Sequence, residues 1–259
     1  MRQCVLIVIL LAVSAFASTA PSPPPTDTRL FKPSTATNAR QAKKQFLRIY
    51  LNAGMNKTFY CGCAFDDNKK INASACGYSP RKTSNPRSRK LEWQHAMPPS
   101  KFGIILQCWQ NAVCRRPNGR PFGGRKCCRK ISPAFKTMEA DMHNLFPAIG
   151  EITGDRAGYP VGEIPKERRK YGECDVEINR KSLEPAESIR GDIARAYFYM
   201  SRLYGVPLRK RFEDRLRRWH LSDPPDQWEM DRNSSIEEIQ GNRNPFIDHP
   251  ERVERIKDF

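Results

Sequence analysis

The sequence has few acidic residues, few histidines and only one long apolar run. Lys and Arg number 45 against 28 Asp and Glu, so the formal net charge is +17. After the apolar run at residues 5–13, no segment approaches the roughly 20 apolar residues that a membrane-spanning helix needs. We therefore expect no membrane span in the mature protein. The charge favours polyanionic partners such as nucleic acid, anionic lipid or polysaccharide.

The N-terminal residues have the pattern of a secretory signal. Arg2 supplies a basic start, the apolar run follows, and Ala15 and Ala17 are the small residues that a signal peptidase recognises. We expect residues 1–17 to be removed and the product to be exported, either to the periplasm or to the medium. An uncleaved N-terminal anchor is the alternative interpretation.

Export gives the cysteines a meaning. Of the nine, Cys4 lies in the predicted signal, which leaves an even number in an oxidising compartment and so predicts disulfides. Eight cysteines allow 105 pairings, and the sequence does not choose among them. A zinc site is the competing interpretation, but it needs Cys pairs at set spacings that these lack. The eight are Cys61, Cys63, Cys76, Cys108, Cys114, Cys127, Cys128 and Cys174.

The chain is short enough for one domain. Residues 18–38 are rich in Pro, Ser and Thr and predict a disordered leader, residues 39–250 a single domain, and residues 251–259 a short charged tail. Apolar spacing predicts a helix-rich α+β fold with few, short strands. Expected helices lie at 39–54, 103–113, 132–147, 184–205, around 212–219 and around 236–239; expected strands lie at 58–61 and 91–96, and expected loops at 66–90 and 115–130.

One of the four histidines, His95, lies where a predicted strand gives way to a pair of prolines. On a strand, Glu92 and Gln94 face one side and His95 the other, although twist and the turn that follows can bring His95 beside an oxygen ligand. Asn144 lies late in a predicted helix. Its amide oxygen is a hard ligand that suits Mg²⁺ or Ca²⁺, but capping of the helix end is an equally simple role for it.

Six segments resemble the bacterial endonuclease I family, the periplasmic or secreted nucleases of the ββα-metal (His-Me finger) group. They occur in the family's order and cover most of residues 40–250, and the long central run is highly specific. The resemblance implies a ββα-metal core with surrounding helices, stapled by disulfides. The segments are TFYCGC (58–63), LEWQH (91–95), GGRK (123–126), MEADMHNLFPAIGE (138–151), GDIARAYFYM (191–200) and QGNRNPFID (240–248).

The resemblance also implies a mechanism. His95 matches the general base that activates water, Asn144 a ligand of one divalent metal, and Arg125 the arginine that holds the phosphate. The metal would be Mg²⁺, with Mn²⁺ or Ca²⁺ as alternatives. A monomer would cut DNA and RNA through backbone contacts without base specificity, leaving 5′-phosphates.

Gln94 departs from the family, which has a metal-binding Glu immediately before the histidine. One hypothesis is that Gln94 still binds the metal through its amide oxygen, supported by Glu92, with a higher metal demand. The other is a weakened or inactive cationic nucleic-acid-binding protein. The loop 111–122 is also longer and more basic than is usual in the family, and it either alters substrate reach or is a tethered surface excursion.

Overall fold

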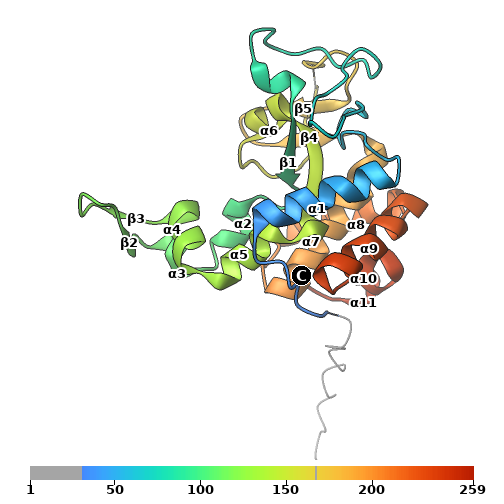
Figure 1. Ribbon diagram of the computed structural model, residues 1–259. Coiled ribbons are helices and arrows are strands. Elements are labelled where there is room, and N and C mark those ends of the chain that lie inside the picture. The colour runs from blue at the N-terminus through green and yellow to red at the C-terminus, as the bar shows by residue number, and fades with distance from the viewer. Residues whose placement is uncertain (1–30, 167) are drawn as a thin grey trace, which may run out of the picture.

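Helices and three small sheets make up the part of the chain that the computed structural model describes, residues 31–166 and 168–259 (Figure 1). The predicted signal and Cys4 lie outside these residues. The helices are α1 Ala39–Asn52, α2 Pro99–Gly103, α3 Gln107–Gln110, α4 Gly124–Ile131, α5 Pro133–Ala140, α6 Gly150–Arg156, α7 Arg190–Tyr204, α8 Lys210–Ser222, α9 Gln227–Gln240, α10 Pro245–Asp248 and α11 Arg252–Arg255. Short 3-10 helices lie at Pro86–Arg89, Met142–Asn144 and Glu187–Ile189. None of the described helices is long and apolar enough to cross a membrane.

The strands form antiparallel pairs, which confirms the helix-rich α+β class. β1 Leu91–His95 pairs with β4 Leu145–Ile149, β2 Cys114–Arg115 with β3 Pro121–Phe122, and β5 Val176–Ile178 with β6 Leu183–Pro185. In the first pair, Gln94 lies opposite Phe146 and His95 opposite Leu145. Helix α6 follows β4 directly and packs against β1. The chain thus contains a strand–strand–helix unit with His95 at one end.

The helix predicted for residues 132–147 is only half as long as expected. It begins as predicted, because the Ser132 hydroxyl accepts a hydrogen bond from the Phe135 N–H and Pro133 occupies the first turn. It ends at Ala140 because the buried carboxylate of Asp141 accepts the backbone N–H of His143 and turns the chain. Residues 145–149 are then strand β4, not helix, and include a proline.

Aromatic side chains fasten α1 to β1. The ring of Phe46 stacks on Trp93 with centroids 4.9 Å apart, and Tyr50 meets the same indole edge-on at 5.8 Å. Buried aromatic pairs of this kind contribute about 1 kcal/mol each beyond the area they bury. Helix α1 begins where expected, with the Asn38 side chain accepting from the N–H groups of Arg40 and Gln41.

Both ends of the described chain pack onto the domain predicted for residues 39–250. Ser34 is buried and the Thr35 N–H donates to the Gln240 carbonyl, so the described part of the predicted leader, residues 31–38, contacts the body. At the other end, the Phe259 ring lies 4.3 Å from that of Phe198, so residues 251–259 pack onto the body. Proline content and charge at these ends gave no sign of the contacts, which are made with residues far away in the sequence.

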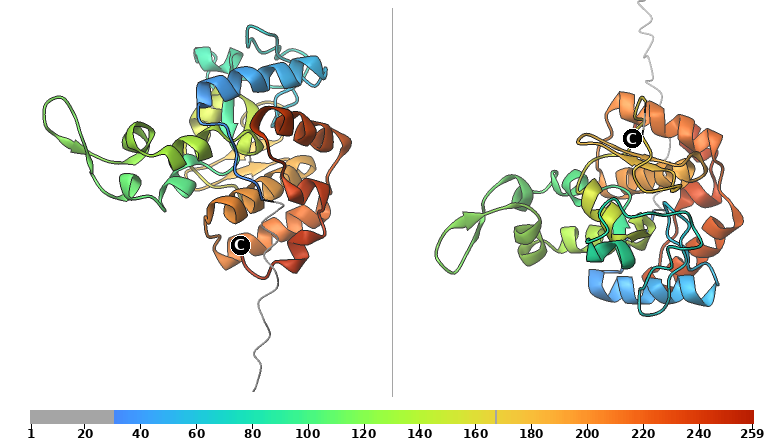
Figure 2. Two further views of the ribbon diagram at one scale, coloured as in Figure 1. Left: turned by 60° about the horizontal axis from the view of Figure 1, so that its bottom comes forward. Right: turned by 90° about the horizontal axis from the view of Figure 1, so that it is seen from above.

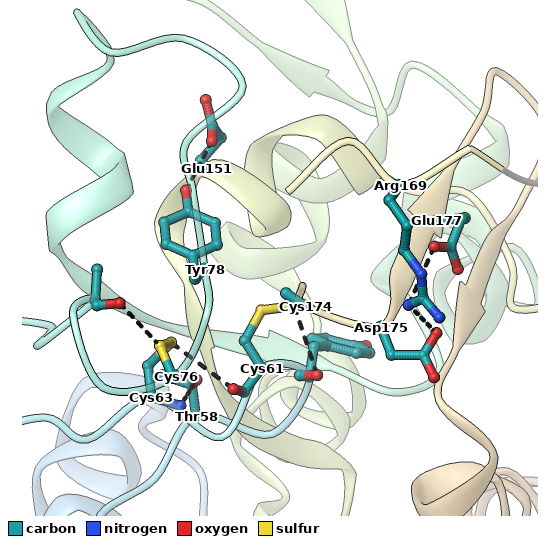
Figure 3. The surroundings of a disulfide bond; sticks show 12 residues. Thr58, Cys61, Cys63, Cys76, Tyr78, Glu151, Arg169, Cys174, Asp175 and Glu177 are labelled. Atoms are coloured by element: carbon teal, nitrogen blue, oxygen red, sulfur yellow. Dashed lines mark hydrogen bonds and ion pairs between the residues drawn. A yellow bond between two sulfur atoms is a disulfide. The ribbon is translucent and has the colours of Figure 1, made fainter. Parts of the chain in front are cut away.

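All eight cysteines of the described residues form disulfides, as export predicts. Cys61–Cys174 and Cys63–Cys76 fasten the segment after α1 (Figure 3), while Cys108–Cys128 and Cys114–Cys127 fasten the region between α2 and α5. The latter region was expected to be a loop at 115–130. It is a hairpin followed by α4, and it projects away from the body in all views (Figures 1 and 2).

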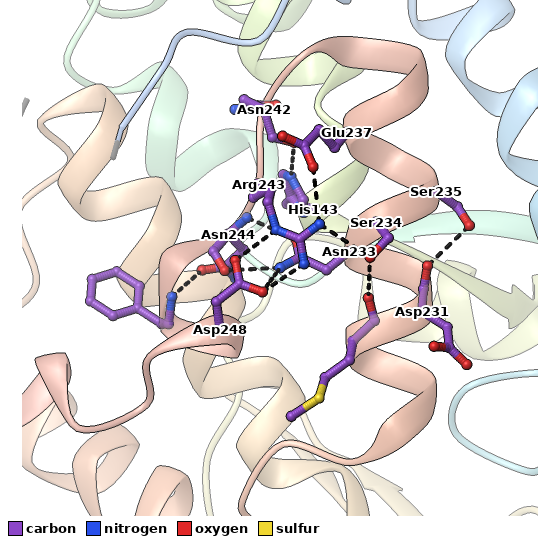
Figure 4. A network of polar contacts seen from close by, with 12 residues as sticks. His143, Asp231, Asn233, Ser234, Ser235, Glu237, Asn242, Arg243, Asn244 and Asp248 are labelled. Carbon is purple, nitrogen blue, oxygen red and sulfur yellow. Dashed lines mark hydrogen bonds and ion pairs between the residues drawn. The ribbon is translucent and has the colours of Figure 1, made fainter. Parts of the chain in front are cut away.

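A buried polar network joins the residues before β4 to the C-terminal helices. Asp141 accepts from Tyr199, Tyr204 and Gln240, and His143 Nε2 donates to the Asn242 carbonyl at 3.1 Å. Beside it, Arg243 forms ion pairs with Asp248 and Glu237, as Figure 4 shows. The family-like segment 240–248 thus packs against the short 3-10 helix Met142–Asn144 that precedes β4.

The buried His143 should make stability fall in acid. Burial lowers its pKa from 6.5 to about 4, so between these pH values the unfolded chain takes up a proton that the folded chain refuses. As the pH is lowered through this range, we expect this group to reduce the free energy of unfolding by up to about 1.4 kcal/mol per pH unit. His143→Gln, which keeps an N–H donor, should flatten that slope in urea titrations at pH 7 to 4.5. An unchanged slope, equal to that of the exposed His249→Gln control, would contradict the assignment.

Candidate active site

The imidazole of His95 is held by a backbone carbonyl of α5. Its Nε2 lies 3.0 Å from the Glu139 carbonyl oxygen, and the side chain is only 6% exposed. A carbonyl can only accept, so Nε2 carries the proton and Nδ1 carries a lone pair. No group of the described residues hydrogen-bonds Nδ1. The lone pair on Nδ1 is therefore free to accept a proton.

The environment keeps this base unprotonated. Burial lowers the pKa of His95 to about 3, and the nearby cations Lys43 and Arg125 act in the same direction, against the carbonyl hydrogen bond. An unperturbed imidazole has a pKa near neutrality. The burial on the inner face of β1 explains the difference, because a low-dielectric site penalises the charged form. His95 is neutral throughout the physiological range.

Two arginines bind the carboxylate of the same glutamate. Arg125 Nε and Arg129 Nε each lie 2.6 Å from one oxygen of Glu139, whose side chain is 4% exposed. Burial raises the pKa of Glu139, but the hydrogen bonds from Arg129 and Arg125 outweigh this and hold its pKa below the usual value. The Arg125 side chain is 41% exposed, and among the described residues its Nη groups have no acceptor. They can meet a phosphate from solvent.

A basic hollow of about 650 Å³ opens next to these groups. Its lining includes Trp93 of β1, Glu139 and half-buried Lys43, whose pKa burial lowers with the help of the neighbouring arginines. An anion entering the hollow would meet several cations and one carboxylate that is already paired. The lining residues are Thr37, Asn38, Ala39, Arg40, Lys43, Lys69, Trp93, Arg129, Lys136 and Glu139.

Helix α6 lies against the opposite face of β1. At Gly150 the approach is so close that a Cβ would lie 2.8 Å from a Glu92 carboxylate oxygen. Further along the same helix, the Arg156 guanidinium donates to the His95 carbonyl at 2.8 Å. Thr153 is three residues from each of these contacts and shares their helix face.

Thr153 of α6 and Gln94 of β1 thus belong to two elements that pack against each other. The Gln94 Oε1 and the Thr153 Oγ1 are both buried, and neither has a hydrogen-bond partner among the described residues. Buried oxygens without partners are costly and call for an explanation such as an ion or water. Sequence reasoning selected Gln94 and missed Thr153, because a threonine inside a short helix carries no signal of its own.

Glu92 and Asn144 have other partners. The Glu92 carboxylate is paired with Arg87, with two hydrogen bonds of 2.7 Å, and its side chain is 34% exposed. The Asn144 side chain is 0% exposed and bonds the backbone of Met97 twice: Oδ1 accepts from its N–H at 2.7 Å and Nδ2 donates to its carbonyl at 3.0 Å. Both contacts shape the segment that follows His95.

The structure thus brings His95 and Arg125 together through Glu139, and places Gln94 next to His95 in sequence but on the opposite face of the same strand. Asn144 holds the turn behind His95 instead of joining them. Sequence reasoning missed Glu139 and Arg156, which hold His95 by a carbonyl and a guanidinium. Among the described residues, no group of three or more His, Cys, Asp or Glu is arranged to hold a metal ion.

Comparison with known proteins decides the family. The family described as Endonuclease I matches residues 34–251, which is most of the chain. The chain belongs to the endonuclease I family. This family member has the strand–strand–helix unit, the fixed histidine and the basic hollow inside the matched region, so the site described above lies within the part of the chain that the family shares.

Several relatives are similar over most of this endonuclease I family chain. A periplasmic deoxyribonuclease of Aeromonas hydrophila is 41% identical over 219 residues, 82% of this chain and 86% of the relative. Endonuclease-1 of Buchnera aphidicola is 38% identical over 84% of this chain and 83% of the relative. An extracellular ribonuclease of Bacillus amyloliquefaciens is 34% identical over 61% of this chain and 63% of the relative.

Proposed function

We propose that the protein is an exported, metal-dependent endonuclease that hydrolyses phosphodiester bonds of DNA and RNA without base specificity. One observation carries the proposal: the Glu139 carbonyl fixes the His95 tautomer, with Nδ1 as a base, beside a hollow lined by cations. The names of the relatives, which include deoxyribonucleases and ribonucleases from the periplasm or the medium, support it. We expect the protein to act as a monomer.

In the proposed reaction, His95 Nδ1 takes a proton from a water molecule. The water oxygen attacks phosphorus, the bond to the 3′ oxygen breaks, and that oxygen takes a proton from solvent, which leaves a 5′-phosphate and a 3′-hydroxyl. The imidazolium that forms keeps its Nε2–H bond to Glu139, so the ring does not turn during the step. Arg125 uses its solvent-facing Nη groups to hold the phosphate while charge develops on it.

A divalent cation fits this site only through neutral donors. Gln94 Oε1 and Thr153 Oγ1 are buried oxygens that lack partners, which is what a hard cation needs, and we propose that they hold it with water filling the other positions. A bound cation would stabilise negative charge on the phosphate and the leaving oxygen. Since neither donor is charged, we expect weak binding that demands millimolar metal. Mg²⁺ is the first choice, with Mn²⁺ and Ca²⁺ as alternatives.

The Asn144 side chain leads us to revise the role that the resemblance suggested for it. Both of its polar atoms bond Met97, and the residue has no exposed surface. We propose that Asn144 positions the turn after His95 and does not bind the metal. Glu92 is similarly proposed to balance Arg87 and not to support the metal, because its two oxygens are already engaged.

Supercoiled plasmid distinguishes this proposal from the second candidate, a cationic binder that cuts nothing, which the uncharged Gln94 favours. We expect purified, oxidised protein to nick plasmid and degrade RNA in millimolar Mg²⁺ or Mn²⁺. In EDTA it should bind both nucleic acids, which a gel shows as slower migration, and cut neither. End-labelled products should carry 5′-phosphates. Intact plasmid after prolonged incubation with either metal, together with retardation, would establish the non-catalytic binder.

A further inference from the structure

A rigid, basic projection extends from the active site. We call residues 107–131 the arm; it comprises α3, the β2–β3 hairpin and α4, and it stands away from the body in Figures 1 and 2. Cys108–Cys128 joins α3 to α4, and Cys114–Cys127 joins the start of the hairpin to α4. Two crosslinks within so short a segment hold it in shape before any partner arrives, which reduces the entropy lost on binding.

The arm carries charge of one sign only. No Asp or Glu occurs between Glu92 and Glu139. At the hairpin tip Arg115, Arg116 and Arg120 are exposed, and none forms an ion pair within the described residues. The tip is closed by the Arg116 N–H bonding the Arg120 carbonyl at 2.9 Å, so these three side chains emanate from one tight turn. Exposed, unpaired cations on a fixed scaffold attract a polyanion.

The tip is connected to the reaction centre without a break. Strand β3 runs through two glycines into the first turn of α4, where Arg125 pairs with Glu139. Arg120 and Arg125 are five positions apart, and extended chain of that length spans at most about 17 Å. This is the rise of about five base pairs of duplex at 3.4 Å each. A backbone held at Arg125 can therefore also pass the tip.

We propose that the arm is a second contact for the phosphate backbone, about five base pairs from the bond that is cut. This proposal rests on the proposed nuclease function, because it requires that Arg125 binds the phosphate at which the chain is cut. The arm would add affinity through counterion release, and would favour substrates long enough to reach it. Phosphate contacts of this kind carry no base preference.

An anionic membrane is the other surface that a basic projection can meet. The exposed aliphatic residues Ile104, Ile105, Val113 and Ile131 lie at the base of the arm or beside it, not at its tip. Pro117 is the one apolar side chain of the tip itself, residues 115–120, and the tip has no large aliphatic or aromatic side chain with which to enter a bilayer. The arrangement favours a polyanion that lies along the arm over a membrane that the tip would have to penetrate.

The salt dependence of binding tests the proposal. The triple variant Arg115→Gln, Arg116→Gln, Arg120→Gln changes only exposed side chains. Binding to a fluorescein-labelled duplex of about 30 base pairs is measured by anisotropy in EDTA, which prevents cutting. Loss of three phosphate contacts should reduce the steepness of the plot of log K against log salt concentration by about 2.7. Between 50 and 200 mM KCl the wild type should therefore lose about 40-fold more affinity than the variant.

The control neutralises Arg209, Arg211 and Arg218, the exposed arginines at α8, in the same way. We expect this variant to keep the wild-type slope, and the arm variant to keep wild-type kcat with saturating long DNA. Equal slopes for all three proteins, or arm-dependent binding to phosphatidylglycerol vesicles without a change in DNA binding, would overturn the proposal. A wild-type protein that binds DNA but never cuts it would refute the nuclease function. The salt dependence of binding in EDTA would still test the role of the arm.

Discussion

Replacing His95 with alanine is expected to reduce DNA cleavage by about 10²–10⁴-fold, the contribution typical of a general base. The variant loses the imidazole whose Nε2–H donates to the Glu139 carbonyl and whose Nδ1 is thereby left as the proton acceptor. Binding of DNA in EDTA should persist, because the arginines and lysines around the hollow are untouched. Initial rates of plasmid nicking and gel retardation, measured on the same preparation, provide the comparison.

His249→Ala is the matched control, since that histidine is half exposed and lies beside Glu251 in the C-terminal segment. It should nick plasmid at the wild-type rate. Circular dichroism must show that the His95 variant is folded, because it leaves a small cavity and an unbonded carbonyl. Nicking by a folded His95→Ala protein within tenfold of the wild type would rule out the assigned base.

Replacing Gln94 with glutamate should have the second largest effect, and in the opposite direction. A carboxylate at this position would add a full charge where the Gln94 amide oxygen now lies buried without a hydrogen-bond partner. We expect the Mg²⁺ concentration for half-maximal cleavage to fall by about tenfold or more, since ligand charge is a main determinant of affinity for hard cations. Cleavage at low metal should be correspondingly faster.

Thermal unfolding gives a readout that does not depend on catalysis. Without metal, Gln94→Glu buries a carboxylate with no partner and should lower Tm; added Mg²⁺ should restore it. Glu92→Gln, which removes a charge two residues away from an existing ion pair with Arg87, should leave the metal demand unchanged. If Gln94→Glu shows neither a metal-dependent Tm nor a lower metal requirement, the cation does not bind at residue 94.

The features that sequence reasoning predicted are those encoded locally. The strand ending at His95 and the helix start at Ser132 follow from short patterns of apolar, proline and capping residues. The export signal predicted that the eight cysteines outside it form disulfides. Neither the pairing of the disulfides nor the hairpin of the arm could be derived, because both depend on contacts between residues that are distant in sequence or on turn geometry in a glycine-rich segment.

The roles assigned around Asn144 show why local patterns were insufficient. Apolar spacing continues to residue 147 and predicts a helix that long, but Asp141 ends it by accepting the His143 N–H. Tyr199 and Tyr204, about 60 residues later, hold the same carboxylate in place, and no periodicity reports a contact at that separation. The partner of Asn144 is Met97, 47 residues earlier. Likewise Thr153 becomes notable only when the structure shows its hydroxyl buried without a partner.

The Cys61–Cys174 bond spans 113 residues, and within that span lie β1, the arm, Glu139 and α6. His95, Arg125 and Glu139 are therefore enclosed in one covalent ring. A protease that cuts a single exposed loop in this ring, such as the tip of the arm, would not separate the two pieces. If the protein is exported as proposed, a single proteolytic nick in this ring would therefore leave the two pieces joined.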